Sequence, residues 1–84
     1  MITLGGPDEA DAGTTVYATA TGFAAGANVV AESNLLGDPI PNVLTQKPGG
    51  GYQVCLTIPA GAIGAVEIEF GDGTKYATKH IKVS

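Results

Sequence analysis

Cysteine and histidine are the side chains in this sequence that could serve as a nucleophile and its base, and the chain has one of each. A catalytic cysteine needs a nearby base and a lowered thiol pKa. Cys55 and His80 lie in separate strand-like segments, and no aspartate or asparagine is spaced to complete a catalytic set. A lone cysteine cannot form an internal disulfide or a Cys/His metal cluster. We expect Cys55 to be an ordinary strand residue and His80 to be exposed on the last strand.

Carboxylates are the second group of side chains that could do chemistry. Asp8, Glu9 and Asp11 cluster in one turn, and Glu67 and Glu69 lie two residues apart in a strand-like segment. Calcium needs six to eight oxygen ligands, and the Asp-x-Asp-x-Asp-Gly loop that supplies them is absent. A glutamate pair performs acid–base chemistry only inside a cleft. We therefore expect solvated turn residues and a solubilising or partner-facing pair, with no catalytic residue, no metal and no cofactor.

Size and charge exclude further classes of protein. The 84 residues include four lysines, no arginine and a net charge of −4. Nucleic acids and anionic membrane surfaces are bound through clustered Lys and Arg, so neither is an expected partner. No apolar run approaches the ~20 residues that span a bilayer. The opening residues, MITLGGPDEADAG, lack the basic and apolar regions of a signal peptide. We expect one domain over residues 1–84, made in a reducing cytoplasm or cut from a larger protein.

The residue pattern along the chain is that of β-strands. Val, Ile and Thr, which favour strands, account for 22 residues. Glycine and proline turns recur about every 8–12 residues, which is typical of sandwiches and barrels. The predicted strands are Ile2–Leu4, Thr14–Thr21, Ala27–Ser33, Asn42–Gln46, Tyr52–Ile58, Ala65–Phe70 and Lys75–Val83.

Alternation of apolar and polar residues gives each strand one buried face, which predicts two antiparallel sheets packed as a sandwich. Continuing the apolar row of the last strand backward would bury Lys79, so we expect a bulge or the end of burial there. Gly71-Asp72-Gly73 is predicted to form a tight hairpin turn, because both residues after Gly71 tolerate positive φ. The residues predicted to face the core are Val16, Ala18, Ala20, Val29, Ala31, Tyr52, Val54, Leu56, Ile58, Val66, Ile68, Phe70, Ile81 and Val83.

Two stretches of the chain have residue patterns that match those of a known family of domains. A strand ending at Thr21 runs into Gly22-Phe23-Ala24-Ala25-Gly26-Ala27-Asn28-Val29, and a later segment, Gly51–Ala62, has an aromatic residue, an alternating strand and Pro-Ala-Gly. These stretches resemble bacterial immunoglobulin-like domains of the IPT/TIG kind, with their G-x-F-x-x-G-x-x-V corner. The resemblance implies an all-β fold, an Ig-like antiparallel β-sandwich of about seven strands.

Four residues are predicted to have structural roles at the turns. Phe23 caps one end of the core, and Gly22 and Gly26 let the chain turn tightly on either side of it. Pro59 ends the strand that begins at Tyr52.

Apolar residues near a proline-rich loop indicate a contact surface, because loops collect at the ends of a sandwich. The alternative, that these residues cover one end of a small core, stays open. The contact regions we expect are the loop Leu35–Val43 and the first turn Gly5–Asp11. The candidate contact residues are Leu35, Leu36, Ile40, Val43, Pro7 and Asp8.

A small Ig-like domain without a leader fits a bacteriophage protein, since phage particles are assembled in the host cytoplasm. Resemblance to the Ig-like modules of phage heads and tails implies a non-enzymatic virion decoration or cementing protein. Its partners would be the major capsid or tail protein and copies of itself. The alternative is an Ig-like spacer or carbohydrate-adhesion module of a bacterial cell-surface or secreted protein.

Overall fold

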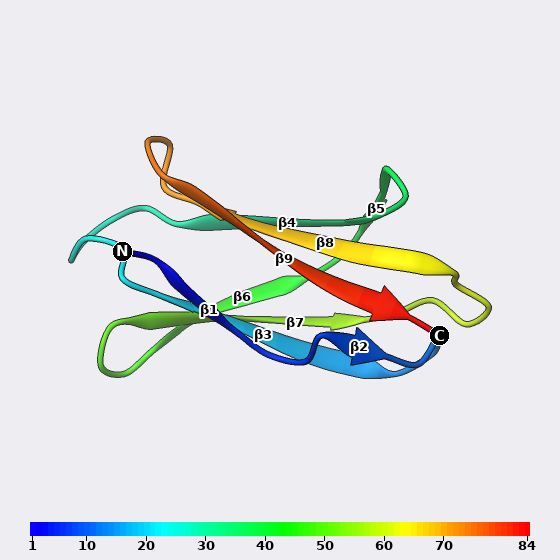
Figure 1. Ribbon diagram of the computed structural model, residues 1–84. Coiled ribbons are helices and arrows are strands. Elements are labelled where there is room, and N and C mark those ends of the chain that lie inside the picture. Colours follow the sequence, from blue (N-terminus) through cyan, green and yellow to red (C-terminus); the bar gives the residue numbers. More distant parts are fainter.

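The computed structural model describes residues 1–84 and contains two sheets packed face to face (Figure 1). The first sheet has the strand order β1 (Thr3–Gly5), β3 (Thr15–Thr21), β7 (Gly51–Thr57), β6 (Val43–Lys47). The second sheet has the order β2 (Glu9–Ala10), β9 (Tyr76–Val83), β8 (Gly64–Gly71), β4 (Val30–Leu35), β5 (Asp38–Ile40). Every strand pair is antiparallel except β2 with β9. No helix in the structure has the length and apolar character needed to cross a membrane.

The strand order is that of the immunoglobulin fold, in which strands A, B, E and D form one sheet and G, F and C the other. β1, β3, β7 and β6 take the first four places, and β9, β8 and β4 take the other three. β2 and β5 are short additional strands at the two edges of the second sheet. The predicted fold class is therefore confirmed, with nine strands where about seven were expected.

The middle of the chain differs from the sequence prediction. The expected loop Leu35–Val43 contains β5, which forms a hairpin with β4, and the chain then crosses to the first sheet as β6. β2 was also missed. Both strands have three residues or fewer, too few to show alternation, and Pro39 in β5 argues against a strand unless it lies at an edge.

The core consists of the alternating rows that the sequence predicted. Every predicted inward residue is buried except Ala31, which is half-buried. Phe70, Ile68, Val66 and Val54 are fully buried, so facing residues of the two sheets fill the space between them.

Of the two outcomes predicted near Lys79, the bulge is absent and the end of full burial is observed, since Ile81 and Val83 are buried whereas Lys79 and Ala77 are half-buried. β8 and β9 pair without interruption from Gly64↔Val83 to Gly71↔Tyr76, and Lys79 lies on the inner face opposite Ile68. Its side chain is only 13% exposed, and its ammonium nitrogen Nζ lies 2.6 Å from Oδ1 of Asp8 beside β2. A lysine is tolerated in this row because its alkyl stem packs inside while its charge reaches a carboxylate at the rim.

The β8–β9 hairpin is confirmed, but only one of the two residues expected to have positive φ in its turn has it. The strands are joined by Asp72–Lys75, and only Gly73 has positive φ there. Asp72 Oδ1 instead accepts hydrogen bonds from the backbone N–H of Thr74 (2.8 Å) and Lys75 (2.7 Å). The aspartate side chain therefore organises a four-residue turn.

Phe23 closes one end of the core, as predicted. It is 9% exposed and meets Tyr52 edge to face, with ring centroids 6.1 Å apart and planes at 88°. The Tyr52 hydroxyl donates a hydrogen bond of 3.1 Å to the Ala27 carbonyl, which ties β7 to the segment before β4.

The two glycines beside Phe23 are also required by the backbone. Gly22 and Gly26 have φ of 101° and 79°, and a Cβ at Gly22 would collide with the Met1 carbonyl oxygen. Pro59 lies directly after the predicted end of its strand, and its carbonyl accepts a hydrogen bond of 3.2 Å from Ala62 N–H.

The two termini lie at opposite ends of the elongated molecule, which measures 39 × 22 × 19 Å (Figure 1). Met1 touches Gly22 at one end of β3, and Ser84 accepts a hydrogen bond from Ala12 N–H near the other end of that strand.

Candidate functional site

The structure keeps the two residues that could form a nucleophile–base pair apart. Cys55 alternates with the buried Val54 and Leu56, so it lies on the outer face of the first sheet. His80 lies on the outer face of the second sheet, beside Glu67 at 3.5 Å. The whole thickness of the sandwich therefore separates the thiol from the imidazole. No group of three or more His, Cys, Asp or Glu residues is placed to hold a metal ion.

The carboxylates are distributed unevenly between the sheets. All eight lie on strands of the second sheet or directly beside them. Lys79 donates a hydrogen bond to Asp8 and, with its positive charge, holds the pKa of that carboxyl below its ordinary value. The backbone N–H groups of Lys75 and Thr74 lower the pKa of Asp72 in the same direction. Asp8 is engaged by Lys79 of β9 and Asp72 by the backbone of its own turn, so neither carboxylate is poised for proton transfer.

The β4–β5 turn carries the most unusual residue of the molecule. Leu35 pairs with Asp38, which leaves a two-residue turn, Leu36-Gly37, with φ of 51° and 89°. Positive φ at both central residues defines a type I′ turn, which is normally built from Asn-Gly, Asp-Gly or Gly-Gly. Leu36 is the one non-glycine residue of the chain with positive φ, and it is 70% exposed.

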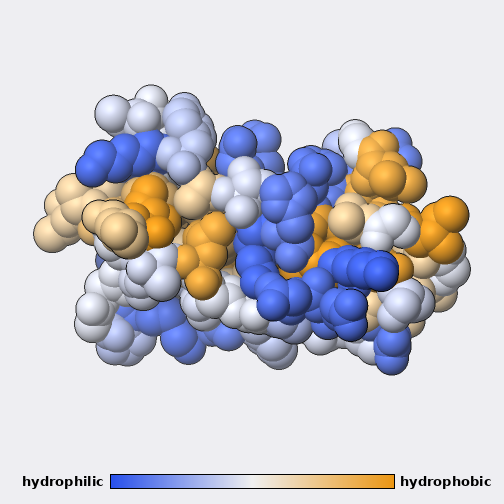
Figure 2. Space-filling view, in the orientation of Figure 1, coloured by the Kyte–Doolittle hydropathy of each residue, from blue (hydrophilic) through white to orange (hydrophobic).

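Leu36 forms the centre of an apolar end of the sandwich. Its side chain lies over Gly64, at which a Cβ would be only 3.0 Å from Leu36 Cδ2, and the neighbouring Ile63 is 73% exposed. Figure 2 shows apolar side chains at this end, where the β4–β5 turn and the β7–β8 connection lie. We call the surface of Leu36, Ile63 and Gly64 the hairpin end.

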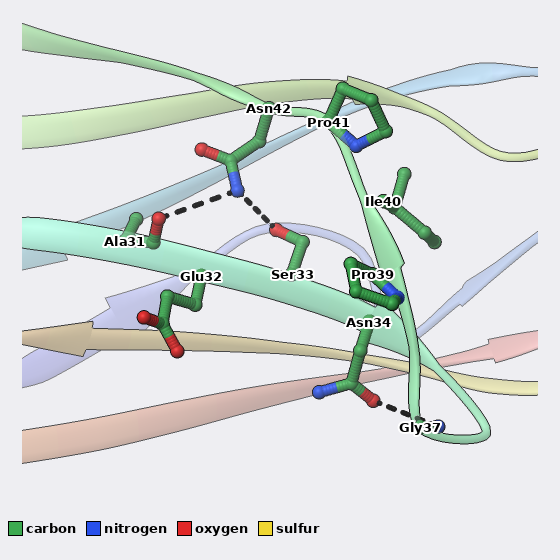
Figure 3. A pocket seen from close by; sticks show the side chains of 9 residues that line it. All are labelled: Ala31, Glu32, Ser33, Asn34, Gly37, Pro39, Ile40, Pro41 and Asn42. Atoms are coloured by element: carbon green, nitrogen blue, oxygen red, sulfur yellow. Dashed lines mark hydrogen bonds between the residues drawn. The ribbon is translucent and has the colours of Figure 1, made fainter.

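A polar hollow of about 590 Å³ adjoins the hairpin (Figure 3). Asn42 Nδ2 donates hydrogen bonds to Ser33 Oγ (2.9 Å) and to the Ala31 carbonyl (3.4 Å), which tie the β5–β6 connection to β4. Asn34 Oδ1 accepts a hydrogen bond of 3.4 Å from Gly37 N–H. The residues lining the hollow are Ala31, Glu32, Ser33, Asn34, Gly37, Pro39, Ile40, Pro41 and Asn42.

A second hollow of about 340 Å³ lies on the other side of the crossover, against the first sheet. It is more apolar than the first, and Val43 at its rim is 65% exposed. Its lining consists of Pro41, Asn42, Val43, Cys55, Leu56 and Thr57. Neither hollow holds a pair of groups suited to acid–base or nucleophilic chemistry, whereas both offer shape and hydrogen-bonding groups to a bound surface.

The predicted contact residues fall into separate groups. Leu36 and Val43 are exposed, Leu35 is half-buried, and Ile40 is 8% exposed and belongs to the core. For Ile40, the alternative that it covers the core is the one observed. Pro7 and Asp8 are exposed beside β2, which is the edge of the second sheet opposite β5. The two predicted contact regions therefore lie at opposite edges of the second sheet.

Sequence reasoning missed Ile63, Ser33 and Asn42. Ser33 and Asn42 come from separate segments and acquire a role only through their mutual hydrogen bond. A signal for the turn was present, because Leu36-Gly37-Asp38 has glycine where a type I′ turn requires it, with leucine in the place usually taken by asparagine.

Comparisons with known proteins leave the family open. No protein-family model matches the chain, and a search of curated proteins finds no similar sequence.

Proposed function

We propose that this chain is a non-enzymatic binding domain that docks onto a larger protein through its hairpin end. The observation that carries the proposal is Leu36, a large apolar side chain held in solvent by a strained backbone. A left-handed conformation costs an L-residue with a Cβ about 1–2 kcal/mol. Asparagine or glycine would lower that cost. Strain of this kind persists at sites where the side chain serves a contact.

The surroundings of Leu36 favour a protein partner. Leu36 and Ile63 are 70% and 73% exposed, so a partner that covers them removes apolar surface from water. The hollow beside the hairpin presents the hydroxyl of Ser33 and the amides of Asn34 and Asn42. An apolar anchor with adjacent hydrogen-bonding groups is the usual composition of a protein–protein contact.

The partner we propose is a shell or tail protein of a bacteriophage particle, with the domain as a decoration or cementing protein. The resemblance to the Ig-like modules of phage particles supports this choice. Symmetric shells repeat one docking site many times, so a small contact can still give high occupancy when copies also touch one another.

Co-sedimentation with purified phage particles tests this proposal. The wild-type domain should sediment with particles that lack it, and Leu36→Asn should sediment with them at least about tenfold less well. The exposed Val30 on the outer face of the second sheet provides the matched control, Val30→Asn, which should bind like wild type. If wild-type protein stays in the supernatant, the virion proposal is wrong.

The positions of the termini favour a second candidate function, that of a spacer or adhesion module. A domain whose ends lie at opposite ends of its long axis can be joined in series without folding back. In that case the polar hollow with Ser33, Asn34 and Glu32 would be the surface that meets carbohydrate. Binding to polysaccharides on a glycan array, lost on Asn34→Ala, would favour this candidate over the virion protein.

A further inference from the structure

The four edge strands of the sandwich are protected to very different degrees. Unpaired edges invite pairing with another chain, and proteins block them with short strands, prolines, charges or bulges. β1 has three residues and ends at Gly5-Gly6-Pro7, and β2 has two residues beside Asp8. β5 has three residues with Pro39 in the middle. Each of these edges therefore carries at least one blocking device.

β6 is the least protected edge. It has five residues, Val43–Lys47, and its flanking prolines, Pro41 and Pro48, lie outside the strand. Its register with β7 is continuous from Val43↔Cys55 to Lys47↔Gly51, so no bulge twists it away. Lys47, its single charge, lies at the end of the strand. A second strand can therefore hydrogen-bond along this edge.

Charge favours a second copy of the chain as the source of that strand. The chain has a net charge of −4, so two copies repel each other over most of their surface. The first sheet contains no carboxylate and one charge, Lys47, because all eight acidic residues lie on or beside the second sheet. Two copies that meet at β6 therefore pair strands that carry no carboxylate.

We propose that two copies associate by antiparallel pairing of their β6 strands about a two-fold axis at Thr45. This pairing places Thr45 opposite Thr45, Leu44 opposite Gln46 and Val43 opposite Lys47. No like charges oppose each other, Thr–Thr pairs are favourable across strands, and both copies of Leu44 stay on the inner side. The result is one continuous sheet of eight strands, four from each copy.

The association is weak and depends on concentration. Pairing of a five-residue strand buries far less than the ~1,600 Å² of a standard stable interface. Sedimentation equilibrium of the purified chain over about 10 µM to about 1 mM should therefore show monomer and dimer in exchange. This measurement needs no other protein, so its outcome is separate from that of the virion proposal.

Charge reversal at the axis tests the register. Thr45→Glu and Thr45→Lys each place like charges opposite each other and should weaken self-association about tenfold, whereas an equimolar mixture of the two should restore it. Thr74→Glu and Thr74→Lys, in the exposed β8–β9 turn, change the charge equally and should leave self-association unchanged. Circular dichroism of each variant establishes that it is folded.

Two outcomes overturn the proposal. One is a chain that stays monomeric up to about 1 mM, which would leave the β6 edge to a strand of another protein. The other is a dimer that responds equally to changes at Thr45 and at Thr74, or that the mixture of Thr45 variants fails to restore. Restoration by the mixture alone supports pairing at Thr45.

Discussion

Leu36→Asn should raise the stability of the domain while lowering its binding. Leu36 has φ of 51°, and relieving a left-handed leucine recovers about 1–2 kcal/mol. The substitution also removes the part of the leucine side chain that packs over Gly64, and this loss lowers the free energy of unfolding. Full burial of a leucine contributes about 1.5–3 kcal/mol, and since Leu36 is 70% exposed, the loss is about 0.5–1 kcal/mol.

The net effect is a gain of about 0.5–1 kcal/mol in the free energy of unfolding, which corresponds to about 2–8 °C in the melting temperature for a domain of this size. Calorimetry at one pH and one protein concentration measures it. Because natural proteins often keep a less stable residue where it serves function, higher stability with weaker binding is the signature of a contact residue.

Two results would refute this reasoning. A melting temperature several degrees below that of wild type would show that Leu36 stabilises the fold by packing, with its strained backbone offset by those contacts. Unchanged binding to particles that bind the wild type would show that the partner does not touch the hairpin end. Val30→Asn is the control, since Val30 is 57% exposed in a regular strand and its loss relieves no strain.

The other predictions concern the core, the N-terminal turn and the thiol. Phe23→Ala should lower the free energy of unfolding by about 3–5 kcal/mol, because it removes a buried ring that packs on Tyr52. Urea denaturation measures this change, and a loss below about 1 kcal/mol would contradict the role of Phe23 as a cap of the core. Asp8→Asn should lower the free energy of unfolding at neutral pH and make it depend less on pH in the acid range. Lys79 holds the pKa of Asp8 below its ordinary 3.8, so the stabilisation from this pair is present above that pH and is lost as the pH falls further. If the free energy of unfolding falls equally with acid in both proteins, the pairing is disproved. Cys55→Ser should change the free energy of unfolding by no more than about 0.5 kcal/mol and leave binding intact, since the thiol lies on an outer face. Loss of binding at an unchanged melting temperature would indicate a functional role for the thiol.

The fold was predictable where a strand is long enough to show its period. In β7 and β8, Val54 and Ile68 face inward because residues two apart share a face, and this follows from the chain itself. Phe23 was predictable for a related reason. A single large aromatic residue between two glycines has to turn toward the core, and the structure places it there.

The candidate site was predictable only in part. The sequence pointed to the segment 35–43 and to Leu36, yet it could not show that Ile40 turns inward or that Asn42 reaches Ser33. These outcomes depend on β5 pairing with β4. Gly37 signals the turn between them, but a strand of three residues is too short to show by alternation which side chains face inward.

Local residue patterns dictate the period of each long strand, most of the core residues and the absence of carboxylates from the strands of the first sheet. Which edges stay open and which charges meet is settled only when the sheets pack together. Lys79 illustrates the reason. Along the chain its position predicts a bulge or the end of burial, but in space it meets Asp8, which is 71 residues away in sequence. Periodicity records which side of a strand a residue faces, whereas a pairing between distant segments depends on how the sheets close around the core.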